Sequence, residues 1–204
     1  MNRREFLKST AWSGAFAAAG GCANMFRLTP GGMASGLCLK PMEHVRVGML
    51  GVGSRGTAAV RRLVKIEGVE ITVVCDLVPE RVARVKKMVK EAGGREPAGY
   101  TGAEGWKALC DAADVDVVYN CTSWDWHLKP CVRAMRNGKV ALVEVPGSLK
   151  IDECWEYVET CEEMRVPCMM LENCVYGEDE MLMLNLAQQG ILGVARPSHR
   201  ARIR

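Results

Sequence analysis

The sequence is poor in the residues that mark metal-bound, nucleic-acid-binding or membrane-spanning proteins. Histidine occurs only three times in 204 residues, and no two cysteines have the Cys-x-x-Cys spacing, so no zinc pattern is present. Aromatic residues make up 6% and the formal net charge is only +3. With 49% hydrophobic residues, this composition excludes collagen, coiled coil and wholesale disorder. No internal repeat occurs, and no apolar run is long enough to span a bilayer.

Basic charge lies at the two ends of the chain rather than over its body. Arg3, Arg4 and Lys8 stand near the start, and arginine recurs through the tail from Arg196 to Arg204. The stretch between these ends is mildly acidic. A nucleic-acid footprint needs a basic face on the fold itself. The sequence therefore predicts that the protein does not bind nucleic acid.

The first 38 residues are typical of an export signal followed by a linker. Arg3-Arg4 precede Phe6-Leu7-Lys8 and an apolar, Ala/Gly-rich run over residues 11–21, which is the order of a secretory leader. The charged string resembles a twin-arginine signal, so we expect a periplasmic protein. Cys22, after small residues, adds the alternative of a lipid anchor. The other alternative is an amphipathic helix that stays attached.

The ten cysteines favour buried thiols. Disulfides would be ordinary in an exported protein, and a metal site is a further alternative. However, Cys75 and Cys121 fall inside apolar runs that resemble strands, where free cysteine behaves as a small buried hydrophobe.

Strand-like and helix-like patterns alternate along the body of the chain. Short β-branched runs predict strands at 44–50, 70–75, 115–121, 140–145 and 168–171. Apolar residues at helical spacing predict helices at 54–66, 79–92, 104–111, 126–136, 151–164 and 181–189. In the helix 151–164 we expect Ile151, Trp155 and Val158 to form the apolar face, with Cys154 and Cys161. Such alternation predicts an α/β fold with a doubly wound parallel sheet.

The turn after the first strand carries a nucleotide-binding pattern. Gly51, Gly53 and Gly56 form G-x-G-x-x-G directly before a predicted helix. The glycines would permit a tight turn, close approach to a pyrophosphate, and close helix–strand packing. Asp76 ends the second strand, where its carboxylate would bind the ribose hydroxyls and repel a 2′-phosphate. The pattern thus favours NAD over NADP; the alternative is a glycine turn without a ligand and an aspartate that caps a helix.

Polar and aromatic residues follow the later strands as well. Trp124-Asp125-Trp126-His127, Glu144-Val145-Pro146 and Glu172-Asn173 all come at the ends of predicted strands. Ligands of open α/β sheets lie beyond the carboxyl ends of the strands, so we expect a site at this edge. The alternatives are tryptophans that pack on the sheet and a histidine that is half-buried or caps a helix.

The stretch from Val45 to Gly190 resembles the NAD-binding half of the glucose–fructose oxidoreductase/inositol dehydrogenase/MocA family. Within it, the chain is most similar to glycosyl hydrolase family 109, the NAD-dependent α-N-acetylgalactosaminidases. Besides the tryptophan and Glu-Val-Pro strings, the resemblance lies in the segments 152–155, 168–174 and 185–190. Many oxidoreductase relatives have Glu-Lys-Pro where this chain has Glu144-Val145-Pro146, which favours the glycosidase branch.

The resemblance implies a Rossmann-type domain that contacts NAD through residues of the glycine turn and the strand ends: Ser54, Arg55, Asp76, Trp124, Asp125, Trp126, His127, Glu144, Val145 and Asn173. It also implies hydrolysis of terminal α-N-acetylgalactosamine by oxidation, elimination, water addition and reduction, an exception to two-carboxylate glycoside hydrolysis.

On this interpretation the chain comprises a signal and linker (1–38), an NAD-binding domain (39–190) and a basic tail (191–204). The second, mostly β domain of the family has no counterpart here, so we assign no catalytic residue. We expect a truncated product that binds NAD weakly, does not turn over, and associates through its uncovered face. The alternatives are a sugar or polyol oxidoreductase and a non-catalytic NAD-binding fragment.

Overall fold

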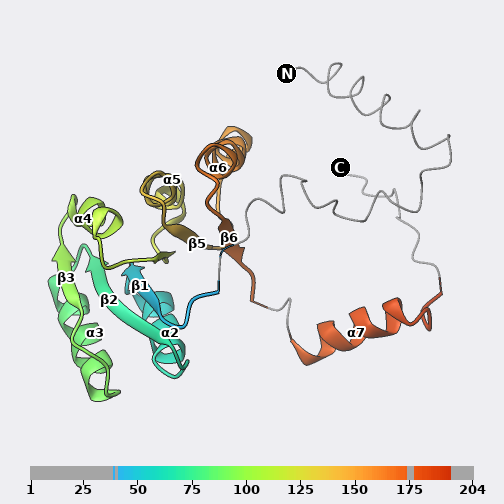
Figure 1. Ribbon diagram of the computed structural model, residues 1–204, viewed down its shortest axis with the longest axis horizontal. Helices are drawn as coiled ribbons and strands as arrows, with labels where there is room; N and C mark the ends of the chain where they lie inside the picture. The colour runs from blue at the N-terminus through green and yellow to red at the C-terminus, as the bar shows by residue number, and fades with distance from the viewer. Residues whose placement is uncertain (1–38, 40, 174–176, 194–204) are drawn as a thin grey trace.

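The computed structural model describes residue 39 and residues 41–173 and 177–193 (Figure 1). The predicted signal with Cys22, the residues 174–176 and the tail from residue 194 lie outside the described residues. Strands and helices alternate through the described chain, with a 3-10 turn at Trp124–Trp126. In chain order the elements are β1 (Val45–Leu50), α2 (Ser54–Leu63), β2 (Val69–Asp76), α3 (Pro79–Glu91), β3 (Ala98–Thr101), α4 (Gly105–Asp111), β4 (Val117–Asn120), α5 (Leu128–Arg136), β5 (Val140–Glu144), α6 (Ile151–Met164), β6 (Cys168–Leu171) and α7 (Glu178–Gln188).

The strands form one sheet in the order β3-β2-β1-β4-β5-β6, and every described pair is parallel. This is the doubly wound Rossmann arrangement, so the predicted fold class is confirmed. The chain starts in the middle of the sheet at β1, winds outward to β3, and then returns to β4. The order therefore reverses between β1 and β4, which is where ligands bind in such sheets.

Helices cover both faces of the sheet. Figure 1 shows α2 and α3 on one face and α4, α5 and α6 on the other. Val60 of α2 and Val85 of α3, both fully buried, pack with Met49 of β1 in the first core cluster. On the other face Leu109 of α4 packs with Leu50 and Val73. Successive side chains of a strand point to opposite faces, so the same strands contribute residues to the hydrophobic core on each face of the sheet.

One extra residue in β2 sets the position of its end. Val47 pairs with Ile71, whereas Gly48 pairs with Val73, so Thr72 is the additional residue of a bulge. Beyond the bulge, Leu50 pairs with Cys75. Asp76 therefore lies one residue past the end of β1, at the carboxyl edge of the sheet.

Several element boundaries differ from the predicted ones, and one strand was not predicted. The strand β3 was missed because only two of its four residues, Tyr100 and Thr101, favour a strand, whereas Ala98 and Gly99 do not. It forms by pairing with β2 beneath α3, so tertiary context creates it. The helix predicted over 126–136 begins at Leu128, after the 3-10 turn. The last helix begins at Glu178, three residues before the predicted start.

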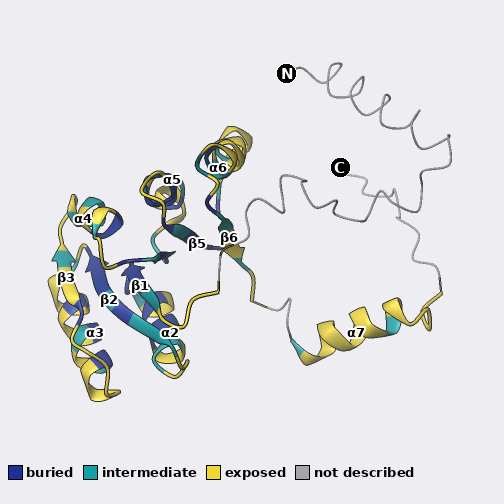
Figure 2. Ribbon diagram, viewed as in Figure 1, coloured by how far each residue is buried: buried dark blue, intermediate teal, exposed yellow. Residues whose placement is uncertain are grey.

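The predicted apolar face of α6 is wrong. Ile151 is 77% exposed and Trp155 is 52% exposed, and Val158 is exposed beside them. Of the predicted face only Cys161 packs against the core, and the helix buries Thr160 beside it. Figure 2 shows α7 exposed along its length, and no residue of α7 is buried.

The seven described cysteines are free thiols, and three of them, Cys75, Cys110 and Cys131, are buried. Within the described ranges, no group of three or more His, Cys, Asp or Glu side chains is arranged to hold a metal. No described helix is both long enough and apolar enough to cross a membrane.

Candidate functional site

The glycine turn between β1 and α2 is built on close backbone contacts. Gly51 has a φ of 80°, and a Cβ on it would lie 2.7 Å from the Cys121 carbonyl oxygen. A Cβ on Gly56 would lie 2.0 Å from the Gly51 carbonyl oxygen. At Gly53, in contrast, a Cβ would meet only the Arg81 side chain, at 3.6 Å. Two glycines are therefore needed for packing, whereas the third leaves backbone open at the start of α2.

No described side chain accepts a hydrogen bond from the backbone N–H groups at the N-terminus of α2. Gly53 is the N-cap residue, no side chain caps the helix, and its first turn holds no acidic residue. Free N–H groups at such a helix end bind anions, phosphate groups above all. The turn can thus hold a pyrophosphate.

Asp76 fixes the neighbouring loops through its buried carboxylate. Its Oδ2 accepts a hydrogen bond from the backbone N–H of Val52 at 2.8 Å, and its Oδ1 accepts one from Val78 at 3.0 Å. Arg81 Nη1 lies 3.5 Å from Oδ1. A carboxylate has about four acceptor positions, so capacity remains for a ribose hydroxyl. Sequence reasoning missed Arg81, although an arginine in the first turn of the helix after Asp76 was a usable signal.

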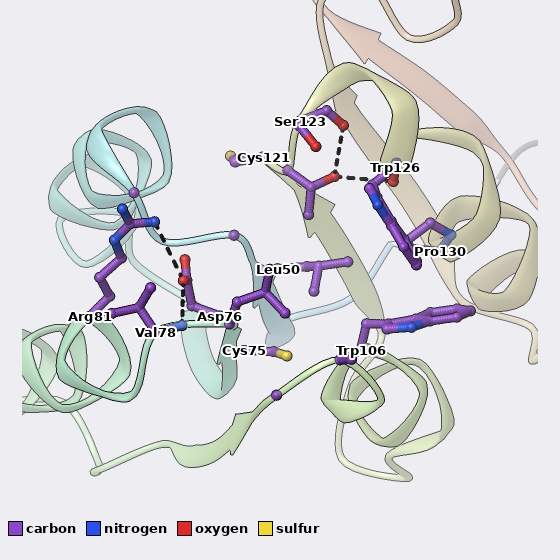
Figure 3. Close-up of a pocket in the computed structure, with 16 residues that line it drawn as sticks. Leu50, Cys75, Asp76, Val78, Arg81, Trp106, Cys121, Ser123, Trp126 and Pro130 are labelled. Carbon is purple, nitrogen blue, oxygen red and sulfur yellow. Dashed lines mark hydrogen bonds and ion pairs between the residues drawn. The ribbon is translucent and has the colours of Figure 1, made fainter.

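A pocket of about 450 Å³ opens beside the glycine turn and Asp76, within the range of small-molecule sites. Figure 3 shows Asp76 and Arg81 toward one end and Trp106, Trp126 and Pro130 toward the other. Of the predicted site residues, four line it: Gly51, Gly53, Asp76 and Trp126. The other lining residues are Leu50, Cys75, Leu77, Val78, Arg81, Gly102, Ala103, Trp106, Cys121, Thr122, Ser123 and Pro130.

Three further predicted residues meet in a second cluster. Arg55 Nε lies 2.9 Å from Glu144 Oε1, and Arg55 Nη2 donates to Asn173 Oδ1. The buried Tyr119 hydroxyl also donates to Glu144 Oε1, at 3.0 Å. The hydrogen bond to Glu144 raises the pKa of Arg55, and burial raises the pKa of Tyr119 to about 12. The cluster joins α2, β4, β5 and the end of β6, and Val145 follows Glu144 as a partly buried residue.

The segment 124–127 is divided between surface and core. Trp124 is 60% exposed and Asp125 is exposed, whereas His127 is fully buried. His127 Nε2 lies 3.2 Å from the Thr122 carbonyl oxygen, and its Nδ1 has no partner among the described residues. Burial lowers the pKa of His127, so a neutral ring with Nε2 protonated fits this environment. Asn120 Nδ2 holds the carbonyl oxygens of Trp126 and His127 at 3.1 and 3.0 Å.

The remaining predicted residues of the turn, Ser54 and Gly56, lie in the first turn of α2. Of the thirteen predicted positions, four line the pocket, three form the second cluster, and His127 lies in the core. Trp106 was missed entirely. Its only signal was a lone aromatic residue at the start of a short helix.

Comparison with known proteins gives a consistent result. Residues 45–172 match the model of the GFO_IDH_MocA oxidoreductase family, described as an NAD-binding Rossmann fold. An alpha-N-acetylgalactosaminidase of Bacteroides fragilis is 42% identical over 158 residues, which are 78% of this chain and 37% of that protein. A glycosyl hydrolase family 109 protein of Bacteroides thetaiotaomicron is 46% identical over 153 residues, or 74% of this chain and 33% of that protein.

The chain thus spans about a third to two fifths of the length of these relatives. Among solved structures, scyllo-inositol dehydrogenase from Lactobacillus casei with bound NAD(H) and scyllo-inositol superposes with a TM-score of 0.66. Its identity is 18%, with coverage of 74% of this chain and 42% of that one. At that identity the likeness concerns the fold.

Proposed function

This chain belongs to the GFO_IDH_MocA oxidoreductase family, and from that premise we propose that it supplies the NAD-binding domain of a glycosidase for terminal α-N-acetylgalactosamine. The observation that carries the proposal is the identity of 42% over 158 residues to an alpha-N-acetylgalactosaminidase and of 46% over 153 residues to a family 109 protein. Val145 adds support, because it stands where many oxidoreductase relatives have a lysine. A sugar or polyol oxidoreductase is the second candidate, favoured by the likeness to inositol dehydrogenase in fold.

NAD fits the residues at the carboxyl edge of the sheet. The glycine turn leaves the backbone open at Gly53 and directs free N–H groups of α2 outward, which suits a pyrophosphate. Asp76 retains acceptor capacity for the adenosine ribose beside that turn. NAD bound at this edge would supply the redox chemistry, which is to accept a hydride from the sugar and later to return it.

The cluster of Arg55, Glu144 and Asn173 would hold the nicotinamide half. It lies outside the pocket at Asp76, at the ends of β5 and β6. Because Arg55 already pairs with Glu144, the two side chains neutralise each other and keep the cluster ordered. Trp124, Asp125 and Val145 complete the proposed contacts on this side, whereas His127 supports the segment from the core through the Thr122 carbonyl oxygen. Their part is orientation of the ring, since orientation contributes much of an enzymatic rate.

A chimera tests the proposed activity. Residues 39–190 replace the matching part of the Bacteroides fragilis enzyme, and the hybrid is incubated with an aryl α-N-acetylgalactosaminide and NAD. We expect sustained release of aryl alcohol without net NADH, and from the same hybrid with Gly53→Ala a release that needs about tenfold more NAD to reach half its maximum. NADH formed in proportion to a sugar or polyol substrate would favour the oxidoreductase. A folded hybrid that binds NAD and does neither would contradict both functions.

We further propose export by the twin-arginine route to the periplasm, based on Arg3-Arg4 and the apolar run that follows them.

A further inference from the structure

The pocket beside Asp76 is polar at one end and aromatic at the other. Asp76 and Arg81 line the polar end, whereas Trp106, Trp126 and Pro130 line the aromatic end (Figure 3). The two indole rings meet edge to face, with centroids 5.9 Å apart and planes at 67°. A nucleoside has the same division, because a flat base adjoins a ribose rich in hydroxyl groups.

Both rings are held in place without any ligand. The Arg133 guanidinium lies 5.9 Å from the Trp106 ring centroid, and Asp111 fixes Arg133 through bonds of 2.8 and 2.6 Å. Lys129 Nζ lies 5.3 Å from the Trp126 ring centroid. A wall that is ordered beforehand costs little conformational entropy when a ligand binds to it.

The aromatic end is separate from the residues proposed for the nicotinamide half. Arg55, Glu144 and Asn173 do not line the pocket, whereas Gly51, Gly53 and Asp76 do. If a dinucleotide binds with its pyrophosphate at the glycine turn and one ribose at Asp76, the base attached to that ribose lies in the pocket.

We propose that Trp106 and Trp126 form the wall that receives the adenine base, and that Trp106 is a binding residue for the adenosine half of NAD. This inference rests on the proposed NAD function. The indole Nε1 of Trp106 is buried and has no partner among the described residues, so Trp106 recognises the base through its ring surface. Contact between an aromatic side chain and a base is worth tenfold or more in affinity.

Titration calorimetry of the full chain with NAD and with ADP-ribose tests this inference. ADP-ribose keeps the adenosine half and lacks nicotinamide. We expect Trp106→Leu to weaken both ligands by the same factor, about tenfold, and Trp106→Phe to recover most of the loss. Trp155→Leu is the matched control, because Trp155 is exposed on α6 and does not line the pocket. Its affinities should equal those of the unchanged chain.

If circular dichroism shows that Trp106→Leu does not fold, Trp126→Leu tests the proposal in its place. Trp126 is 42% exposed, so its replacement disturbs the core less. It should also weaken both ligands equally. Loss of affinity for NAD alone, or for neither ligand, would overturn the assignment of the wall to adenine. Failure of the unchanged chain to bind either ligand would instead overturn the NAD function on which the inference rests.

Discussion

Two glycines of one turn, replaced by alanine one at a time, should separate cofactor binding from stability. A Cβ on Gly56 would lie 2.0 Å from the carbonyl oxygen and 3.0 Å from the carbonyl carbon of Gly51. Both are backbone atoms of a turn that is itself packed against Cys121, so neither can move away cheaply. A Cβ on Gly53 would meet only the end of the Arg81 side chain, at 3.6 Å.

The expected magnitudes follow from these distances. Overpacking a well-packed site costs about 1–3 kcal/mol, and a contact with rigid backbone places Gly56→Ala at the upper end. For a chain of this size, about 3 kcal/mol lowers the melting temperature by roughly 6–12 °C. Gly53→Ala should cost only about 1 kcal/mol, because alanine is a poorer N-cap residue than glycine. It should nevertheless lower the affinity for NAD at least about tenfold, because the added methyl group lies where the pyrophosphate comes close to the backbone.

Differential scanning calorimetry without ligand and titration calorimetry with NAD measure the two effects on the same samples. Each variant is the control for the other, since both add one methyl group to the same turn. Wild-type affinity in Gly53→Ala would show that no phosphate comes close to this backbone. An unchanged melting temperature in Gly56→Ala would refute the close packing of α2 against β1.

Three other changes test separate parts of the molecule. Asp76→Ala should weaken NAD by about 1–3 kcal/mol and reduce discrimination against NADP, because Arg81 remains beside the ribose position; unchanged affinity in calorimetry would remove Asp76 from the site. Burial keeps the pKa of His127 below 6.5, so its contribution to stability is present above about pH 6.5 and is lost as pH falls through the folded pKa. His127→Asn should therefore show a flatter decline of the urea midpoint between about pH 7.5 and pH 5.5 than the unchanged chain, and equal declines would contradict a buried neutral ring. Replacing Arg3 and Arg4 together by lysine should leave the precursor in the cytoplasm in a fractionation assay, and normal export of that variant would reject the twin-arginine assignment.

The sheet and its glycine turn were predictable because their determinants are local. β-branched runs, helical spacing and the glycine pattern lie within short stretches of chain, and all describe the same alternating unit. The strand β3 lacked such a signal, since Ala98 and Gly99 favour no strand by themselves. It exists because β2 offers a free edge and α3 covers it.

The contents of the pocket depend on contacts between distant residues, which no short pattern encodes. Trp106 and Trp126 belong to different elements and meet only because α4 and α5 pack on the same face of the sheet. Likewise, the resemblance named Arg55, Glu144 and Asn173 separately, but their ion pair and hydrogen bond form because the Arg55 side chain reaches from the start of α2 to the ends of β5 and β6.

The wrong face of α6 shows a physical limit of periodicity. Spacing tells which residues share one side of a helix, but two sides of α6 carry apolar residues, and burial depends on the neighbour. Tyr157 donates a hydrogen bond to the Gly147 carbonyl oxygen at 3.0 Å, and Thr160 is buried. Tyr157, Cys161 and Met164 also pack against the core cluster supplied by α5 and β5, so Ile151, Trp155 and Val158 face outward. The side of α6 that meets neighbouring elements is therefore the buried one, although the opposite side carries the larger apolar residues.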